Sequence, residues 1–379
     1  MRPARLLFVV FSVYVLWRGS LLLFAFAGTN LGYAPFFAPK SGAERPSGYF
    51  VEAWCQWDCA WYDRIIDHGY TAASYGRHDQ REAAFFPLYP ALSRGLGEII
   101  GSRRAAGLIV SHTGAILGLF FTLLLGLLFF DEEKAKRALV LLLVFPGSVF
   151  LSAFYSEGLF LCGAAGSFFW FFKRRWLLCG LFGALAVLSR SAGILLFPVF
   201  AAALAYDIAR RRDRFDWAML WLLLIPAALG AYMAALHAAV GDPFAFVAAQ
   251  RGWGRTFTFP LATIAREIGG IDPGFPKGAR NVHRIADTAA AVSFLGISAA
   301  MALRRYHPAL WLFVAGGVLM PLSTGQANSM VRFVAVLFPA FYFLADISED
   351  RRTERALVYG FSFFLAVYTL MFLNGRWAG

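Results

Sequence analysis

The sequence predicts an all-α polytopic membrane protein. Of its 379 residues, 59% are hydrophobic and only 15% are charged, whereas soluble domains average about 45–50% apolar and about 25% charged residues. Forty Phe and eleven Trp add to this excess. A chain this apolar has too little polar surface to cover a water-soluble globule, which excludes a soluble enzyme, a disordered chain and a small disulfide scaffold.

The predicted helices follow from the apolar stretches. A helix that crosses a bilayer needs about 20 mostly apolar residues. On this criterion the sequence has about eleven candidate transmembrane helices, at 6–27, 105–130, 138–155, 157–172, 176–189, 191–208, 217–240, 286–303, 309–323, 331–347 and 356–374. The first one resembles a signal peptide ending at Ala25-Phe26-Ala27, but it is long enough to span, so we expect an uncleaved helix.

Basic residues set the predicted orientation. With the N-terminus in the cytoplasm, Lys and Arg gather in the inner segments, at 2–5, 134–137, 173–175, 210–214, 304–305 and 351–355. This is the bias that the positive-inside rule describes. It accounts for the net charge of +12, and no nucleic-acid partner is predicted. The partner implied by the composition is the lipid bilayer.

Two predicted outer segments are long. Residues 28–104 and 241–285 exceed the usual length of a connection, and loops of this length are usually functional. Both are rich in Trp, Phe, Tyr and Pro, so we expect interfacial helices that lie on the membrane surface. We interpret residues 1–379 as a single membrane domain with these two extracytoplasmic loops.

The first outer loop contains a candidate catalytic acid. Trp54, Trp57, Trp61 and Ile65 recur at helical spacing and predict an amphipathic helix. Asp58 lies next to its aromatic face, where a partly desolvated carboxylate can act as a general base near neutral pH. The alternative is an interfacial helix with aromatic anchors and a solvated acid, and the residues alone leave both open.

No metal site or nucleotide site is predicted, and no cofactor. Cys55 and Cys59 form a lone CxxxC, which is a weak metal signal, and the histidines are scattered without ligand spacing. One helix would hold the two cysteines at a poor angle for a disulfide, so whether they are bonded stays open. The sequence has no Walker loop and no GxGxxG motif at a strand–helix junction.

Charged residues beside apolar helices are further candidates. Glu157 lies between two predicted spans, where a carboxylate is expensive unless it faces a cavity or a partner; a water-facing turn is the alternative. Arg190 and Arg332 are the basic residues of the short outer turns. An anionic headgroup or phosphate is a natural partner for them, and snorkelling to outer headgroups is the alternative.

The second outer loop adds a polar and aromatic surface. Gln250, Arg251, Trp253 and Arg255 lie close together in the sequence. Aromatic faces suit sugar rings, and Arg pairs bidentately with phosphate. This stretch therefore predicts a place for a sugar phosphate.

Taken in order, these motifs resemble the PIG-V family, the GPI mannosyltransferase 2 group of the GT-C superfamily of glycosyltransferases. The matching pieces run from about residue 50 to 340. They are Trp57-Asp58, Trp61-Tyr62, His68-Gly69-Tyr70, Phe85 to Pro90, Tyr155-Ser156-Glu157, Arg190 with Gly193, Gly241 to Phe244 through Gln250 and Trp253, and Arg332-Phe333 before Phe338-Pro339.

The resemblance implies a GT-C fold and a polyprenyl-phosphate-linked sugar donor, used on the extracytoplasmic face. It also implies that an Asp of the first outer loop is the catalytic base, and here that position is Asp58. Our hypothesis for the reaction is an inverting, metal-independent transfer of mannose or another hexose to an acceptor hydroxyl, which forms an α-linkage. Arg332, Arg190 and Arg251 are the candidates for the donor phosphate. The candidates for the sugar or the acceptor are Trp57, Trp61, His68, Tyr155, Glu157, Gln250 and Trp253.

The chain is shorter than eukaryotic relatives and rich in Ala and Arg, as in a bacterial protein. The expected location is then the bacterial cytoplasmic membrane with the site facing the periplasm, or the ER membrane if the chain is eukaryotic. The acceptor is left open, because bacteria do not make GPI anchors.

A polyprenyl-lipid transporter or flippase is the rival from another class. It also needs outward-facing cations, but transporters carry polar groups near mid-membrane in broken helices and often have inverted repeats. Here the polar residues cluster at the outer ends of the predicted spans, which favours an enzyme. A third possibility is a purely structural membrane scaffold. That function would not explain why Asp58, Glu157 and the outer arginines lie on one side of the membrane.

Overall fold

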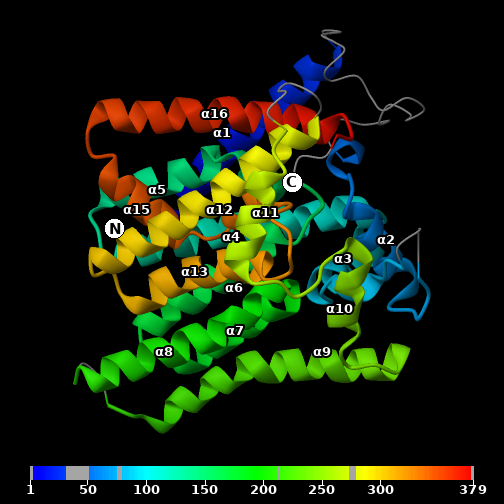
Figure 1. The fold of residues 1–379 in the computed structure, drawn as a ribbon, viewed down its shortest axis with the longest axis horizontal. Coiled ribbons are helices and arrows are strands. Elements are labelled where there is room, and N and C mark those ends of the chain that lie inside the picture. The colour runs from blue at the N-terminus through cyan, green and yellow to red at the C-terminus, as the bar shows by residue number, and fades with distance from the viewer. Residues whose placement is uncertain (1–2, 31–50, 75–78, 212–213, 273–278, 377–379) are drawn as a thin grey trace.

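The computed structural model describes residues 3–30, 51–74, 79–211, 214–272 and 279–376. These residues form helices joined by loops (Figure 1), which confirms the predicted all-α class. Parts of the two predicted outer loops, at 31–50, 75–78 and 273–278, lie outside the described residues.

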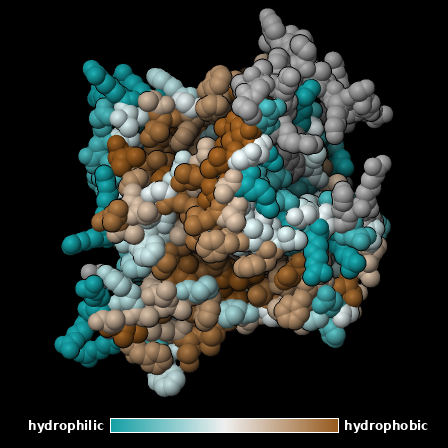
Figure 2. All heavy atoms as spheres, viewed as in Figure 1, coloured by the Kyte–Doolittle hydropathy of each residue, from teal (hydrophilic) through white to brown (hydrophobic). Residues whose placement is uncertain are grey.

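Six helical segments among the described residues are long and apolar enough to cross a membrane. They are α1 (Pro3–Asn30), α4 (Arg103–Gly126), η5 with α8 (Ser191–Leu195 and Leu196–Ala209), η6 with α9 (Trp217–Leu223 and Leu224–Val240), α12 (Ala279–Leu303) and α16 (Arg351–Leu373). Hydrophobic residues cover the middle of the face in Figure 2, and hydrophilic residues gather toward both ends. The chain is therefore a multi-pass membrane protein.

The predicted number of eleven spans is not confirmed. Three of the predicted spans are the helices α6 (Glu157–Phe172), α7 (Trp176–Ser189) and α13 (Pro308–Leu322), with 16, 14 and 15 residues. At 1.5 Å per residue they measure only about 21 to 24 Å, against a hydrocarbon core of about 30 Å.

Two further predicted spans are broken. Residues 138–155 form parts of α5 (Glu132–Val144) and η4 (Pro146–Ser152), which are bent by 84° at the break. Residues 331–347 form α14 (Met330–Val334) and α15 (Pro339–Ile347). Proline begins the second helix in both cases, and it cannot supply the N–H that would continue the first one.

Close contact between helix backbones fixes the start of α6, which is almost entirely buried. A Cβ atom at Gly114 of α4 would lie 2.6 Å from the amide nitrogen of Leu159, and one at Gly158 would lie 2.3 Å from the carbonyl oxygen of Ser111. Small residues allow helices to approach this closely in membranes. Glu157, the first residue of α6, is thereby held against α4.

Charged residues of the predicted inner segments meet at one end of the molecule. Lys134 lies 2.7 Å from Asp346, Arg304 lies 3.0 Å from the same carboxylate, and Arg137 lies 3.2 Å from Glu354. The basic residues and Glu354 come from three separate predicted inner segments, and Asp346 lies at the end of the predicted span 331–347. Their contact agrees with the predicted alternation of the chain, while the compartment that this end faces stays a prediction.

Short helices gather at the opposite end, on the right in Figure 1, where α2 (Cys59–His68), α3 (Leu88–Ile100) and α10 (Ala245–Ala248) lie. The remaining short helices are η1 (Glu52–Trp54), η3 (Glu82–Ala84), η7 (Ala249–Trp253) and α11 (Pro260–Gly269). The predicted amphipathic helix from Trp54 is wrong in its first turn. The chain turns at Trp57, which has a φ of +54°, and α2 begins only at Cys59.

Candidate active site

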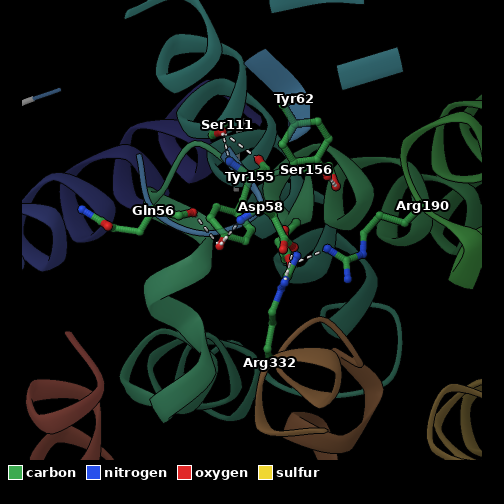
Figure 3. A network of polar contacts seen from close by, with 9 residues as sticks. Gln56, Asp58, Tyr62, Ser111, Tyr155, Ser156, Arg190 and Arg332 are labelled. Carbon is green, nitrogen blue, oxygen red and sulfur yellow. Dashed lines mark hydrogen bonds and ion pairs between the residues drawn. The ribbon is translucent and has the colours of Figure 1, made fainter. Parts of the chain in front are cut away.

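Asp58 is held at the start of α2 by Tyr155. The fully buried Tyr155 hydroxyl accepts a hydrogen bond from the Asp58 backbone N–H (3.2 Å) and donates one to the Gln56 carbonyl (2.9 Å). The Ser111 hydroxyl of α4 in turn donates to the Tyr155 carbonyl (2.8 Å). Figure 3 shows these residues side by side. The loop that carries Asp58 is therefore anchored to the packed junction of α4 and α6.

A disulfide between Cys55 and Cys59 brackets the same loop. It settles a question that the sequence left open. The two cysteines were expected to share one helix, which would hold them at a poor angle for a disulfide. Instead, Cys55 precedes the turn at Trp57 and Cys59 begins α2. The Cα atoms lie 5.2 Å apart, which is within the usual range for a disulfide. The bond also occupies both thiols that a metal ion would have needed.

We expect reduction of this disulfide to lower the thermal stability of the protein. A loop of this length is worth about 2 kcal/mol on the chain-entropy model. The measurement is a melting curve in detergent with and without dithiothreitol. The matched control is the double variant Cys55→Ser/Cys59→Ser, which should melt like the reduced protein and show no further change with dithiothreitol. Equal melting temperatures for oxidised and reduced wild type would contradict the expectation.

Four charged side chains form a continuous buried network. Arg332 Nη1 lies 2.6 Å from Asp58 Oδ2, and Arg332 Nε donates to Glu157 Oε1. Arg190 donates to the same Glu157 oxygen. Figure 3 shows Arg190 and Arg332 reaching the centre from two sides. The Glu157 side chain is 1% exposed and that of Arg332 is 6% exposed, so Glu157 meets a partner rather than water.

Arg255 adds a cation without a counter-ion. Within the part of the chain that the structure describes, its guanidinium contacts the Phe333 ring, with 5.6 Å from Cζ to the centroid, and no acid. Arg190 lies over the same ring at 5.7 Å. Burial first, and the nearby charge of Arg332 second, lower the pKa of Arg255 to about 10. Three arginines and two carboxylates leave one positive charge uncompensated.

These residues surround a cavity of about 160 Å³. Asp58, Arg190, Arg255 and Arg332 line it, and the Asp58 Oδ1 atom has no partner among the described residues. The other lining residues are Tyr62, Ala84, Phe85, Phe86, Ser156, Ser189, Ser191, Gln250, Trp253, Gln326, Asn328, Ser329 and Phe333. A carboxylate with a free oxygen thus faces a space with a net positive charge.

A second cavity of about 220 Å³ adjoins the first and is mainly apolar. Arg190, Gln250, Arg255 and Phe333 line both cavities. Most of the remaining wall is apolar and includes Ile194, Phe246, Val247, Met320, Val336 and Leu337. The arrangement can hold an anionic group beside Arg255 with an attached apolar chain along this wall.

The structure brings most of the predicted site residues together. Asp58, Arg190, Arg332, Gln250 and Trp253 line the first cavity. Three others lie behind its wall: Glu157 in the ion-pair network, Tyr155 under the Asp58 loop, and Trp61, which stacks on Phe85 at a centroid distance of 5.8 Å.

Three predicted site residues lie elsewhere. His68 is exposed at the end of α2, Arg251 is exposed on η7, and half-buried Trp57 forms the turn before Asp58. None of the three lines the first cavity, and their predicted roles stay predictions. The chain turns between Arg251 and Arg255 at Gly254, which has a φ of +68°, a conformation that glycine adopts at little cost.

That reversal turns Arg255 into the cavity in place of Arg251. The glycine after Trp253 indicated a turn at this point. The sequence did not indicate which way the chain would turn, and therefore which arginine would line the cavity. Tyr62, Gln326, Asn328 and Phe333 were also missed as cavity residues. Of these, Gln326 and Asn328 lie in a polar stretch between two apolar helices, which was the available signal.

No protein-family model and no curated protein matches the chain. Solved structures do match it. The Archaeoglobus fulgidus oligosaccharyltransferase, in complex with zinc and sulfate, aligns with a TM-score of 0.52 and 15% identity, over 94% of this chain and 52% of that one. ArnT from Cupriavidus metallidurans, bound to undecaprenyl phosphate, aligns with a TM-score of 0.52 and 14% identity, over 91% and 62%.

The likeness is one of fold. These glycosyltransferases confirm the GT-C fold that the sequence resemblance implied, while membership of the PIG-V family stays a prediction. The chain spans about half to three fifths of the length of these neighbours.

Proposed function

We propose that the protein is an inverting glycosyltransferase that moves a mannose, or another hexose, from a polyprenyl-phosphate donor to an acceptor hydroxyl. The observation that carries the proposal is the uncompensated cation Arg255, placed between a carboxylate-bearing cavity and an apolar one. The GT-C fold supports a transferase, and ArnT with its bound undecaprenyl phosphate supports the class of donor.

The donor phosphate would lie between Arg255, Arg190 and Arg332. Arginine suits phosphate because its planar guanidinium offers paired donors. The polyprenyl chain would follow the apolar cavity, which shares Arg190 and Arg255 with the polar one. The sugar would extend toward Asp58 past Trp253 and Phe85, whose rings lie 5.8 Å apart.

The reaction needs one base and no acid. An acceptor hydroxyl attacks the anomeric carbon, its proton passes to Asp58 Oδ1, and the bond from that carbon to the phosphate oxygen breaks. The polyprenyl phosphate leaves with the electron pair, and the fixed arginines stabilise its growing negative charge. Because attack comes from the opposite face, a β-linked donor gives an α-linked product. Arginine side chains take the part of a metal ion in this proposal.

The finer assignments rest on the sequence. The motif order from Trp57-Asp58 to Phe338-Pro339 supports a PIG-V-like mannosyltransferase, and the charge bias supports an active site on the extracytoplasmic face. A disulfide beside Asp58 agrees with that side, since disulfides persist in oxidising compartments.

The test is consumption of radiolabelled mannosyl-phosphoryl-polyprenol by purified protein in detergent with EDTA, followed as sugar released to water or transferred to a lipid extract. We expect consumption by wild type and none by Asp58→Ala. Equal binding of the donor by both proteins without consumption would favour the lipid-transport function, because detergent offers no second leaflet. Neither binding nor consumption would remove this donor from the proposal.

We expect Arg255→Gln to raise the KM for the donor by more than tenfold with a smaller change in kcat. Truncating one partner of a buried charge pair costs about 2–5 kcal/mol in binding. The control is Arg251→Gln, four residues away and exposed, which should leave the donor KM within twofold of wild type. A larger effect of Arg251→Gln than of Arg255→Gln would restore the assignment made from the sequence.

Asp287 of α12 holds the helix that carries Arg332. Its side chain is 4% exposed and accepts from the Ser329 N–H (3.1 Å) and the Val331 N–H (3.0 Å), at the start of α14. Ser329 itself has a φ of +70°, so these bonds hold a backbone conformation that serine rarely adopts.

We therefore expect Asp287→Ala to lower kcat and raise the donor KM, because the two buried N–H groups lose their acceptor and Arg332 shifts. Asp287→Asn, which keeps one carbonyl oxygen as an acceptor, should recover part of both. Kinetics and melting curves are measured together. Thr288→Val is the control for packing of the same helix, since Thr288 Oγ1 is buried without a partner among the described residues. Equal loss in Asp287→Ala and Thr288→Val would contradict a positioning role.

A further inference from the structure

A third cavity, of about 690 Å³, lies on the other side of the segment from Gly325 to Asn328. This volume is within the range of about 300–1,000 Å³ for small-molecule sites. Its wall comes from the second outer loop, α11, the start of α12 and the segment 325–328. Gln326 and Asn328 line both this cavity and the Asp58 cavity.

The charged side chains of this cavity balance in number, and each of them has a partner within the protein. Arg284 Nε lies 2.9 Å from Glu267 Oε2, and Arg266 donates to the Gly325 carbonyl. Asp287 is occupied by the two N–H groups at the start of α14. Two arginines and two acids line the cavity, so its formal charges balance.

The groups left over in this cavity are neutral. Within the described residues, the Thr256 hydroxyl, the His283 ring and the Asn328 amide have no hydrogen-bond partner. Gln326 Nε2 donates hydrogen bonds to the carbonyls of Trp253 (3.0 Å) and Gly254 (2.9 Å). The side-chain oxygen of Gln326 remains available as an acceptor. Hydroxyls, amides and an imidazole in one wall match a ligand with many neutral hydroxyl groups.

We propose that this cavity binds the acceptor and that the acceptor presents a neutral glycan. The proposal rests on the proposed function, because it places the second substrate of that reaction. The apolar cavity suits the lipid of the donor, and the cation-rich cavity suits its phosphate. A glycan in the third cavity reaches the Asp58 cavity past Asn328, which lines both. Its leading hydroxyl is then the one that loses its proton to Asp58.

The experiment measures binding and turnover on the full chain in detergent, with three probes. Radiolabelled mannotriose is the neutral glycan, trigalacturonate is an anionic molecule of similar size, and dodecanol is an apolar alcohol. We expect mannotriose to bind and to stimulate donor consumption, and the other two to do neither. His283→Ala and Thr256→Val should each weaken mannotriose binding about fivefold, as the loss of one hydrogen bond implies, without changing donor KM.

His237→Ala is the matched control, because His237 is exposed on α9 and lines none of these cavities. It should bind mannotriose like wild type. Preferential binding of trigalacturonate or dodecanol, or unchanged mannotriose binding in both His283→Ala and Thr256→Val, overturns the inference. Because binding is measured without donor, that failure is distinct from failure of the proposed function, which shows as absent donor consumption.

Discussion

Asp58→Asn is expected to fold normally and to lose about 10²–10⁴-fold in turnover. Removal of a well-placed general base typically has this effect. The amide has the shape of the carboxylate but cannot take up a proton at the reaction's pH. The backbone bonds from Tyr155 and the disulfide beside it do not depend on the side chain, so the loop should keep its position.

The change acts on the charge network in a defined way. Arg332 loses a carboxylate at 2.6 Å but retains Glu157. Binding of the donor phosphate should therefore stay the same or become tighter, while the rate falls. Donor KM and kcat, measured separately, distinguish this result from general damage.

Asp63→Asn is the matched control. Asp63 lies in α2, five residues after Asp58, pairs with Arg104 at 3.1 Å and lines neither of the two cavities beside Asp58. It should keep wild-type turnover. Near-normal turnover in Asp58→Asn would show that another group takes the proton.

The sequence indicated the site well where a residue violated a strong rule. Arg190 and Arg332 opposed the positive-inside bias, and Glu157 was a carboxylate between apolar helices. Each violation has a physical cause in the structure: the three side chains satisfy one another around Glu157 Oε1. Asp58 was found beside an aromatic face, although its helix begins later than predicted.

Prediction failed where the outcome depends on direction or on tertiary packing. Arg251 and Arg255 are chemically equivalent in sequence, and only the left-handed turn at Gly254 decides which one enters the cavity. The predicted number of spans is not confirmed for a similar reason. A helix such as α6 is apolar all round because protein surrounds it, and composition alone does not separate such a helix from one that spans lipid.

Glu157→Gln is expected to have the largest effect on stability. The carboxylate is 1% exposed and holds both Arg190 and Arg332. Removing one member of a buried ion network costs about 3–5 kcal/mol, because the remaining charges stay buried without compensation. A clear fall in melting temperature in detergent is the expected result. The control is Glu98→Gln, whose pairing with Arg94 is largely exposed and contributes little.

The same variant tests whether the cavity is built for an anion. Glu157→Gln raises the uncompensated charge around the cavity from one to two, and Glu157→Gln/Arg190→Gln returns it to one. If a phosphate normally completes the network, undecaprenyl phosphate should raise the melting temperature of Glu157→Gln more than that of wild type. It should stabilise the double variant less than Glu157→Gln, since one of the binding cations is gone. Equal stabilisation of all three proteins would mean that the lipid phosphate binds away from Arg190, Arg255 and Arg332, and the donor would then need another position relative to Asp58.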